Sequence, residues 1–368
     1  MGDPSLAMNR LACISGCSSK GPACVLLEIE GRRILLDAGV GPDAGAVPPL
    51  EFLEPIDALL LSHAHKDHAG AMRLLKHWGS FPVYATETTL RILGIPNGIP
   101  LPSRGSGEVL GMEVRTGRTG HASGSIWIRF PQKGGFLYMG DSSEESQVYA
   151  FDPPPPSELI AFDASYGLYD EKNSLDSSLW KQVLQTGSVV LPVPAEGRSL
   201  EFVLLLKERG YDTIYVDSRI YTTLRQTLDQ DRDYLRPGVA ERLESVLSSL
   251  EESRISHPEG IHIVTDGEAS EGSAAWQWIT QYERDTTPLF LFTGYLGKGT
   301  TAERIVTSGR GLWVRWNAHP TLEENLRLIQ QVGARKVIPM FNPEPDIFLS
   351  PQVNLPEILL LDGEDIHW

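Results

Sequence analysis

The strongest chemical signal in the sequence is the six-residue segment His63-Ala-His65-Lys-Asp67-His68. Three imidazoles and a carboxylate supply the nitrogen and oxygen ligands that zinc binds at about 2.0–2.2 Å. The segment follows a short apolar run at 58–61 and precedes a stretch with helical spacing at 69–78. It is therefore expected on a loop between a strand and a helix, where neighbouring side chains can converge on one metal site. A chance cluster of histidines in a polar loop is the alternative interpretation, and this placement disfavours it.

One loop cannot supply the ligands of a site that holds two ions, so further ligands must come from later in the chain. His121 and Asp141 each follow a glycine and are expected at strand edges, although either one alone is a weak signal. Together with the first segment they indicate two cations about 3.5–4 Å apart around a shared hydroxide, with Asp141 as a bridging ligand. Asp37 follows a predicted hairpin and is a candidate acceptor that orients a ligand histidine. An ordinary turn residue is the other interpretation of Asp37.

The elements that position these residues change in type along the chain. In the first half, paired β-rich runs at 25–29 and 34–36, and at 126–130 and 136–139, flank short turn sequences and predict two hairpins. From about residue 177, helical stretches alternate with short apolar strands, which indicates a parallel α/β unit. A length of 368 residues fits one large domain with an insertion, or two domains.

The bulk composition is that of a soluble globular protein, with 41% hydrophobic and 22% charged residues. No apolar run approaches the roughly 18 residues of a membrane span, and no secretion signal is recognisable at the start, so we expect no membrane association. Cys13, Cys17 and Cys24 form a poor disulfide framework. We expect ordinary buried thiols and a cytoplasmic protein.

The net charge of −16 disfavours a binder of long nucleic acids, which usually shows a basic surface. Basic residues such as Arg198, Arg219, Lys298 and Arg304 could still form a local positive patch. Binding responds to the field at the site and not to the total charge.

These residues resemble the metallo-β-lactamase superfamily, because Asp37, the segment at 63–68, His121 and Asp141 match its first four motifs in order. Four later segments resemble motifs of the β-CASP branch. They are Phe162-Asp163-Ala-Ser-Tyr-Gly167, Leu191 to Glu201 (which contains Arg198), Phe292 to Thr300 (which contains Lys298) and Asn317-Ala-His319. The resemblance covers residues 11 to 341.

The resemblance implies an α/β fold: an αββα metallo-β-lactamase sandwich with an inserted α/β β-CASP-like cap domain. The sandwich would comprise residues 1–175 and 309–368, and the cap residues 176–308. The branch consists chiefly of nucleases. A zinc-dependent phosphodiesterase that cleaves RNA is therefore expected, with nucleic acid as its partner and RNA favoured over DNA.

The resemblance also implies a distribution of the ligands over two zinc ions. The first ion would take His63, His65, His121 and Asp141, and the second Asp67, His68 and Asp141. The branch's RNA-cutting members have a late histidine at the second ion, where this chain has Phe341, which cannot bind zinc. The second ion is therefore expected to bind more weakly, with a water or His367 as the substitute ligand.

The expected mechanism is in-line attack on phosphorus by a metal-activated hydroxide, with Asp67 as a catalytic carboxylate in the centre. His319 would protonate the leaving oxygen, and Asp163 would orient His319. Arg198 and Lys298 are candidates for binding substrate phosphates. Pairing of Arg198 with a carboxylate such as Glu201 is an equal alternative.

Other functions stay open at this point. A DNA nuclease fits the missing late histidine, and a hydrolase of small esters or of cyclic or short oligonucleotides fits the acidic charge. A non-catalytic scaffold in a processing complex is the alternative outside enzymology, and its mark would be loss of the histidine segment. A second copy of the chain or another protein are candidate partners.

Overall fold

The structure is a computed structural model that describes residues 8–78, 80–175, 178–211, 213–350, 353, 355–356 and 361–368. The chain forms two compact units. Unit 1 comprises Met1–Glu145, Ala150–Glu171 and His319–Trp368, and unit 2 comprises Ser146–Tyr149 and Lys172–Ala318. The chain thus returns to unit 1 at 318/319, later than the expected boundary at 308/309. The reason is that β17 (Gly311–Trp313) pairs with β16 (Leu289–Phe292) in the sheet of unit 2.

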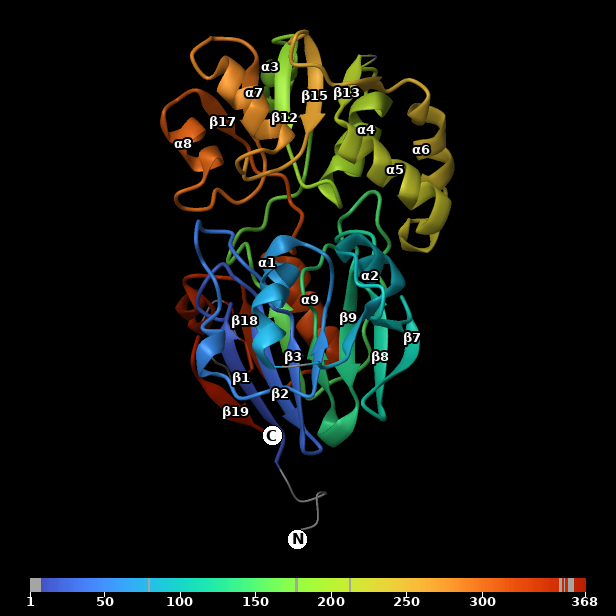
Figure 1. Ribbon diagram of the computed structural model, residues 1–368, viewed down its shortest axis with the longest axis vertical. Coiled ribbons are helices and arrows are strands. Elements are labelled where there is room, and N and C mark those ends of the chain that lie inside the picture. The colour runs from blue at the N-terminus through green and yellow to red at the C-terminus, as the bar shows by residue number, and fades with distance from the viewer. Residues whose placement is uncertain are drawn as a thin grey trace. The chain divides into compact units, whose positions relative to one another are not determined.

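A first sheet in unit 1 contains both ends of the described chain. Its strands, in spatial order, are β19 (Asp365–His367), β1 (Arg10–Ser15), β2 (Cys24–Ile29), β3 (Arg32–Leu36), β4 (Ala58–Leu60), β5 (Val83–Thr86) and β6 (Ile99–Leu101). The expected hairpin is confirmed, because β2 and β3 pair antiparallel around Glu30 and Gly31, and Figure 1 shows β1, β2 and β3 side by side. Strands β3 and β4 are parallel, so their carboxyl ends lie at the same edge.

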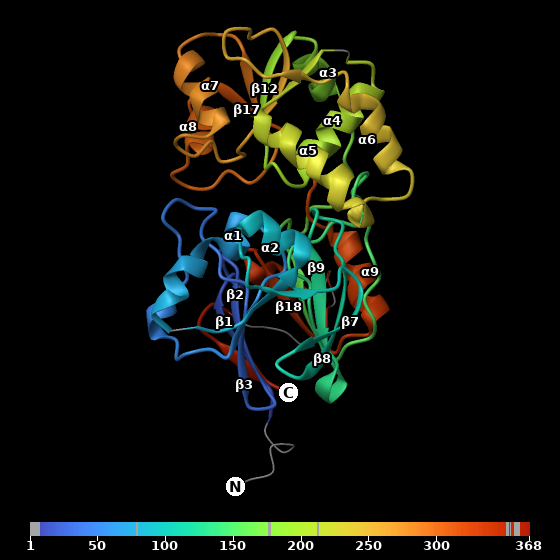
Figure 2. The ribbon, with the colours of Figure 1, turned by 45° about the vertical axis from the view of Figure 1, so that its right-hand side comes forward.

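A second sheet in unit 1 places three parallel strands together. Its strands, in spatial order, are β18 (Lys336–Met340), β11 (Leu159–Asp163), β10 (Phe136–Tyr138), β9 (Ile126–Phe130), β8 (Met112–Arg118) and β7 (Gly105–Val109). The expected hairpin of β9 and β10 is confirmed, and Figure 2 shows β7, β8 and β9 next to one another. Because β10, β11 and β18 are parallel, the residues that follow them gather at one edge.

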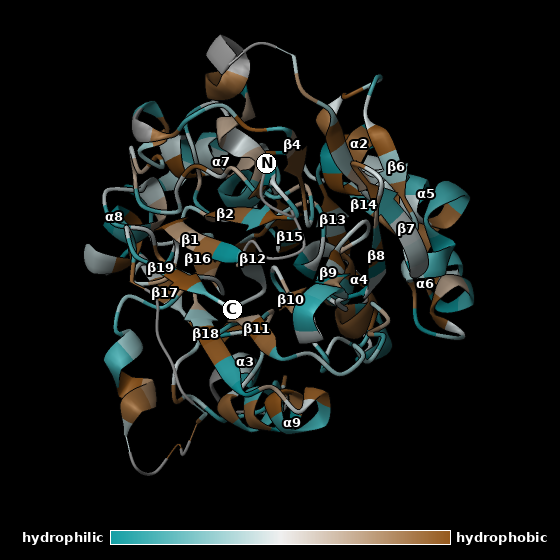
Figure 3. Ribbon diagram, turned by 90° about the horizontal axis from the view of Figure 1, so that it is seen from below, coloured by the Kyte–Doolittle hydropathy of each residue, from teal (hydrophilic) through white to brown (hydrophobic). Residues whose placement is uncertain are grey.

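Helices cover the outer faces of both sheets. The core between the sheets includes Leu27 and Leu36 from one and Ile128 from the other. Outside the first sheet pack α1 (Lys66–Ala69), the 3-10 helix η3 (Gly70–Trp78) and α2 (Glu87–Leu93). Outside the second sheet packs α9 (Leu322–Val332), along which hydrophobic and hydrophilic residues alternate in Figure 3. These layers confirm the αββα sandwich.

The helical stretch expected at 69–78 is thus divided between the short α1 and the 3-10 helix η3. Gly70 stands at the junction because a Cβ there would lie 2.5 Å from the Val40 side chain. Glycine also has a low helix propensity, which accounts for the change of helix type at this position.

Unit 2 is the parallel α/β unit that the sequence predicts. Its described strands, in spatial order, are β14 (Glu251–Glu252), β13 (Ile214–Val216), β15 (Gly260–Val264), β12 (Ser188–Pro192), β16 and β17. All their pairings are parallel. Its helices are α3 (Ser178–Leu184), α4 (Arg198–Glu208), α5 (Ser218–Gln230), α6 (Val239–Leu247), α7 (Ala274–Tyr282) and α8 (Thr301–Thr307). Leu200, Leu224 and Leu243 join α4, α5 and α6 in one apolar cluster.

The expectation of ordinary buried thiols is wrong for two of the three cysteines. Cys13 and Cys17 form a disulfide, whereas Cys24 is free and buried. The pairing of β1 with β2 shifts register between Cys13 and Ser15, and the chain then turns at Gly16. This local turn brings the two cysteine Cα atoms to 6.3 Å, a separation that a disulfide spans. Cysteine usage therefore gives no support for a reducing compartment.

None of the described helices combines the length and apolar character needed to cross a membrane.

Candidate metal centre

In unit 1, the candidate residues lie at or just beyond the carboxyl ends of parallel strands in both sheets. Asp37 follows β3, and His63 lies three residues beyond the end of the parallel strand β4. Asp141 follows β10, and Asp163 is the last residue of the parallel strand β11. His65 is the N-cap of α1, which places the rest of the histidine segment in the first turn of that helix.

Two glycines let the loops at these edges come close together. A Cβ at Gly39 would lie 1.6 Å from the backbone oxygen of Asp67, so only glycine permits this approach. Gly140 has a φ of 54°, and a Cβ there would lie 2.7 Å from the Ser62 side chain. The histidine loop is therefore packed directly against the loops that carry Asp37 and Asp141.

A first group of candidate ligands contains His63, His65, His121 and Asp141. One ligand atom from each residue lies within 4.8 Å of the others. Nε2 of His121 is 3.5 Å and Nε2 of His63 is 3.8 Å from Oδ2 of Asp141. The structure therefore brings together residues that are separated by up to 78 positions, from 63 to 141.

A second group contains Asp67, His68 and Asp141. Nε2 of His68 lies 3.1 Å from Oδ1 of Asp141, while Oδ2 of Asp141 faces the first group. A single carboxylate thus contributes one oxygen to each group, which is the geometry of a bridging ligand.

Phe341, at the position of the expected late histidine, packs beside the second group. It follows β18, and its ring centroid lies 5.2 Å from that of His68. Its side chain is 2% exposed. His367 lies in β19, where it pairs with Arg10 of β1, and belongs to neither group within the described residues. It therefore does not substitute for the missing ligand.

Asp37 orients His68 through a buried hydrogen bond. Its Oδ2 accepts a hydrogen bond from Nδ1 of His68 at 2.7 Å. Ser62 donates to the same carboxylate through both its backbone nitrogen and its hydroxyl, each at 2.7 Å, and the Tyr138 hydroxyl donates at 2.8 Å. The sequence reasoning did not identify Ser62 or Tyr138. The available signals were a serine at the end of the apolar run 58–61 and a tyrosine three residues before Asp141.

Burial and charge shift the ionisation of these groups in opposite directions. Burial, together with the neighbouring imidazoles, lowers the pKa of His63 well below its ordinary value. Burial also opposes protonation of His68, but the carboxylates of Asp141 and Asp37 raise the pKa of His68 well above its ordinary value. For Asp141, burial is outweighed by His68 and His319, which hold its pKa well below its ordinary value.

The residues present fit a metal ion of the zinc class. Nε2 of His63 is buried and has no hydrogen-bond partner within the described part of the chain, although it points at the other ligand atoms. An orphaned buried imidazole nitrogen costs free energy unless a ligand takes its lone pair. The donor set of imidazoles and carboxylates is the set that zinc prefers.

His319 lies at the same edge and is paired with Asp163. Nδ1 of His319 is 2.8 Å from Oδ2 of Asp163 and 3.8 Å from Oδ2 of Asp141. Its ring packs near two others, with centroid separations of 5.2 Å to His121 and 5.3 Å to Tyr166. The predicted partners therefore meet next to the two ligand groups.

Arg198 and Lys298, the predicted substrate-binding residues, both belong to unit 2. Arg198 is the first residue of α4, and its guanidinium lies 3.4 Å from the Thr293 hydroxyl. The carboxylate of Glu201 accepts hydrogen bonds from Ser146 and Trp316. Lys298 lies in the loop before α8.

Comparison with known proteins supports this assignment of the fold. Residues 20–185 match the Metallo-beta-lactamase superfamily. At the level of the fold, the chain is similar to the crystal structure of a protein of unknown function from Enterococcus faecalis V583. The TM-score is 0.63 and the identity 16%, and the match covers 98% of this chain and 100% of that one.

Curated relatives match most of the chain. The transcription termination factor FttA of Methanothermobacter thermautotrophicus is 26% identical over 80% of this chain and 57% of its own length. An RNase J-like protein of Methanocaldococcus jannaschii is 23% identical over 86% of this chain and 88% of its own length. The endoribonuclease YSH1 of Eremothecium gossypii is 22% identical over 88% of this chain and 54% of its own length. The chain thus spans little more than half of FttA and of YSH1. The superfamily match and these relatives together indicate the β-CASP branch of the metallo-β-lactamase superfamily.

Proposed function

We propose that this chain is a zinc-dependent phosphodiesterase that cleaves RNA. The observation that supports it most is the position of Asp141, which contributes one oxygen to each ligand group while His319 lies 3.8 Å from the same carboxylate. Metal ligands and a candidate proton donor therefore share one edge of the sandwich. The names of the relatives, an endoribonuclease and an RNase J-like protein, favour RNA as the substrate.

The proposal assigns the first zinc to His63, His65, His121 and Asp141, and the second to Asp67, His68 and Asp141. Zinc bound by these residues would supply an activated water as nucleophile and positive charge for the phosphoryl oxygens. Asp37 holds the ring of His68 in a fixed orientation through its hydrogen bond to Nδ1. Because Phe341 stands where a further ligand is expected, the second ion would bind less tightly than the first.

His319 is the proposed general acid. Its Nδ1 donates to Asp163, so Nε2 is the atom that would deliver a proton to the leaving oxygen. Asp163 is fully buried and holds the imidazole in one orientation. Arg198 and Lys298 are the proposed contacts to substrate phosphates, since a guanidinium and an ammonium both bind phosphate oxygens.

A second candidate is hydrolysis of DNA or of short or cyclic oligonucleotides. The net charge of −16 favours a short substrate, because a long polyanion would be repelled outside any local positive patch. Phe341 favours DNA, because the resemblance implies that the DNA-cutting members of the branch also lack the late histidine.

The test combines metal analysis with cleavage assays. Purified protein is analysed for bound zinc and then incubated with end-labelled and internally labelled RNA and DNA, and with a chromogenic phosphodiester. We expect bound zinc and faster cleavage of RNA than of DNA. Turnover of the chromogenic diester without polymer cleavage would instead favour the small-substrate candidate.

The decisive variant is Asp67→Ala, with Asp229→Ala as the matched control. Asp67 belongs to the second ligand group, whereas Asp229 is an exposed carboxylate on α5. We expect Asp67→Ala to abolish cleavage and to lower zinc content, and Asp229→Ala to change neither. Full activity of Asp67→Ala would refute the proposed centre, and a protein without zinc or turnover would indicate a scaffold.

A further inference from the structure

A lysine that the proposed mechanism does not use lies close to the Asp163–His319 pair. Lys20 belongs to the loop between β1 and β2, which we call the Lys20 loop (residues 16–23). Its ammonium group donates a hydrogen bond to the hydroxyl of Ser165 at 2.7 Å. That hydroxyl donates in turn to Oδ1 of Asp163 at 2.5 Å. Because Oδ2 of Asp163 accepts from His319, the hydrogen bonds form a continuous chain from Lys20 to His319.

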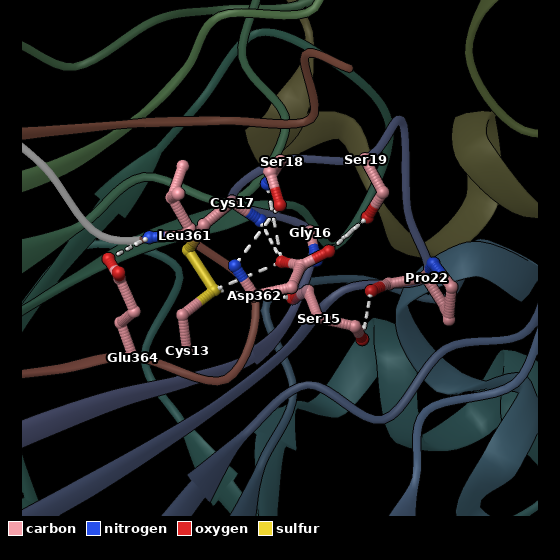
Figure 4. The surroundings of a disulfide bond; sticks show 10 residues. All are labelled: Cys13, Ser15, Gly16, Cys17, Ser18, Ser19, Pro22, Leu361, Asp362 and Glu364. Atoms are coloured by element: carbon pink, nitrogen blue, oxygen red, sulfur yellow. Dashed lines mark hydrogen bonds between the residues drawn. A yellow bond between two sulfur atoms is a disulfide. The ribbon is translucent and has the colours of Figure 1, made fainter. Parts of the chain in front are cut away.

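Several contacts hold the Lys20 loop in place close to the backbone of Lys20. The Cys13–Cys17 disulfide closes its beginning. Figure 4 shows the carboxylate of Asp362, which accepts hydrogen bonds from the backbone nitrogen of Cys17 at 2.7 Å and from the hydroxyl of Ser19 at 2.8 Å. Phe341 donates its backbone N–H to the carbonyl of Gly16. These contacts fix the backbone position from which the side chain of Lys20 extends.

The direction of the Ser165 hydroxyl follows from the chemistry of its neighbours. A hydroxyl has one proton to donate, and the Lys20 ammonium has only donors. With Lys20 donating to its oxygen, Ser165 must direct its single proton to Asp163. The buried Asp163 carboxylate then receives side-chain donors on both oxygens, from Ser165 on Oδ1 and from His319 on Oδ2, beside the backbone N–H groups of Ser165 and Ser142, each at 3.1 Å. A buried carboxylate that is satisfied on both sides keeps one orientation.

We propose that Lys20 is a positioning residue for His319, acting through Ser165 and Asp163. Its charge fixes the Ser165 hydroxyl, the hydroxyl fixes the plane of the Asp163 carboxylate, and the carboxylate fixes the imidazole. The kinetic part of this inference rests on the proposed function, since it takes His319 to be the general acid. Direct binding of a substrate phosphate by Lys20 is the competing role, and the test separates the two.

The kinetic test compares Lys20→Met with Ser165→Ala in the zinc-loaded protein. Loss of a hydrogen bond to a charged group is worth on the order of tenfold in rate. We expect each variant to lower kcat about tenfold with unchanged KM and unchanged zinc content. The double variant should be no slower than either single one, because both changes break the same chain. Lys20→Arg, which keeps the charge, should recover most of the lost rate.

The control is Lys133→Met, which removes an exposed lysine from the turn before β10, at the opposite end of that strand from Asp141. It should leave both constants unchanged. Lys20→Met in a His319→Gln background should cause no further loss, because the acid that Lys20 positions is already absent. A further loss there, or a rise in KM with unchanged kcat, would overturn the proposal and assign Lys20 to substrate binding.

A second readout does not depend on turnover. The Nδ1 proton of an imidazole bonded to a carboxylate gives a downfield resonance that can be followed in protein labelled with ¹⁵N-histidine. The resonance is assigned to His319 by its loss in His319→Gln. We expect Lys20→Met and Ser165→Ala to shift or broaden it, and Lys133→Met to leave it unchanged. An unchanged resonance in Lys20→Met refutes the positioning role whatever the activity. Absence of phosphodiesterase activity in the unsubstituted protein would instead refute the proposed function.

Discussion

Nδ1 of His319 lies 2.8 Å from Oδ2 of Asp163, although 156 positions separate the two residues in the chain. Asp163 ends β11, before the chain enters the long part of unit 2 at Lys172, and His319 is the first residue after the chain returns from it. The pair therefore forms only when the last segment of unit 1 has packed against the segment that carries Asp163. Its position beside Asp141 suggests the first prediction.

Replacement of His319 should slow chemistry without removing metal. We expect His319→Gln to lower kcat on RNA by about 10²–10⁴, the usual contribution of a general acid, with zinc content unchanged. Asp163→Asn should cause a smaller loss, because the imidazole remains but loses its charged partner. Zinc content is measured by elemental analysis and kcat under saturating substrate. Loss of zinc in His319→Gln would show that His319 is a ligand and not an acid.

Replacement of Phe341 by histidine should strengthen the second metal site. The ring of Phe341 lies 5.2 Å from that of His68, within the reach of a shared ion. Phe341 has a φ of 66°, a conformation that histidine tolerates better than most side chains. We expect Phe341→His to retain more zinc per chain after dialysis, at some cost in stability from the lost apolar packing. Phe341→Leu is the control, and equal zinc retention in the two variants would contradict the prediction.

Acid should destabilise unit 2 through His262. Burial lowers the pKa of His262 to about 4, and the ring stacks on Tyr215 with centroids 4.5 Å apart. An unfolded histidine takes up a proton near pH 6.5, so between about pH 6.5 and pH 4 the unfolded chain binds more protons than the folded one. The contribution to stability is therefore present above pH 6.5 and lost as the pH falls toward 4.

Chemical denaturation at several pH values tests this contribution. Between pH 6.5 and 4 the free energy of unfolding should fall by roughly 1–3 kcal/mol more in the unsubstituted protein than in His262→Gln. His367, which is exposed on β19 in unit 1, gives the control His367→Gln. Parallel curves for His262→Gln and the unsubstituted protein would show that this imidazole is not the acid-sensitive group.

Reduction of the disulfide should weaken unit 1. The bridge closes a short loop, with Cys13 and Cys17 four positions apart. On chain entropy alone, such a loop contributes about 2 kcal/mol to the free energy of unfolding. Denaturation with and without reductant should differ by this amount. A Cys13→Ser/Cys17→Ser double variant should be insensitive to reductant, and sensitivity in that variant would point to another thiol.

The candidate ligands could be predicted from the sequence because so many histidines and aspartates rarely occur within a few residues of one another. His63, His65 and His68 stand within six residues, and no packed core requires such a group. The hairpins and the parallel α/β unit were predictable from local apolar periodicity, which directly reflects which faces are buried.

The contacts that support the ligands were not predictable in the same way. Tyr138 reaches Asp37, and Lys20 reaches Ser165, only because strands far apart in the sequence lie in particular registers. The disulfide was missed because it depends on a register shift after Cys13, which leaves no trace in residue spacing. The return boundary was misplaced because β17 joins its sheet through a pairing and not through a change in composition.

The pairing of β1 with β19 and of β11 with β18 has a consequence for biosynthesis. All the described strands of unit 2 are translated before β18 and β19, so the sandwich lacks an edge strand of each sheet until those two strands emerge. Until β18 and β19 emerge, nascent β1 and β11 expose unpaired backbone along one side, which makes them candidate sites for chaperone binding.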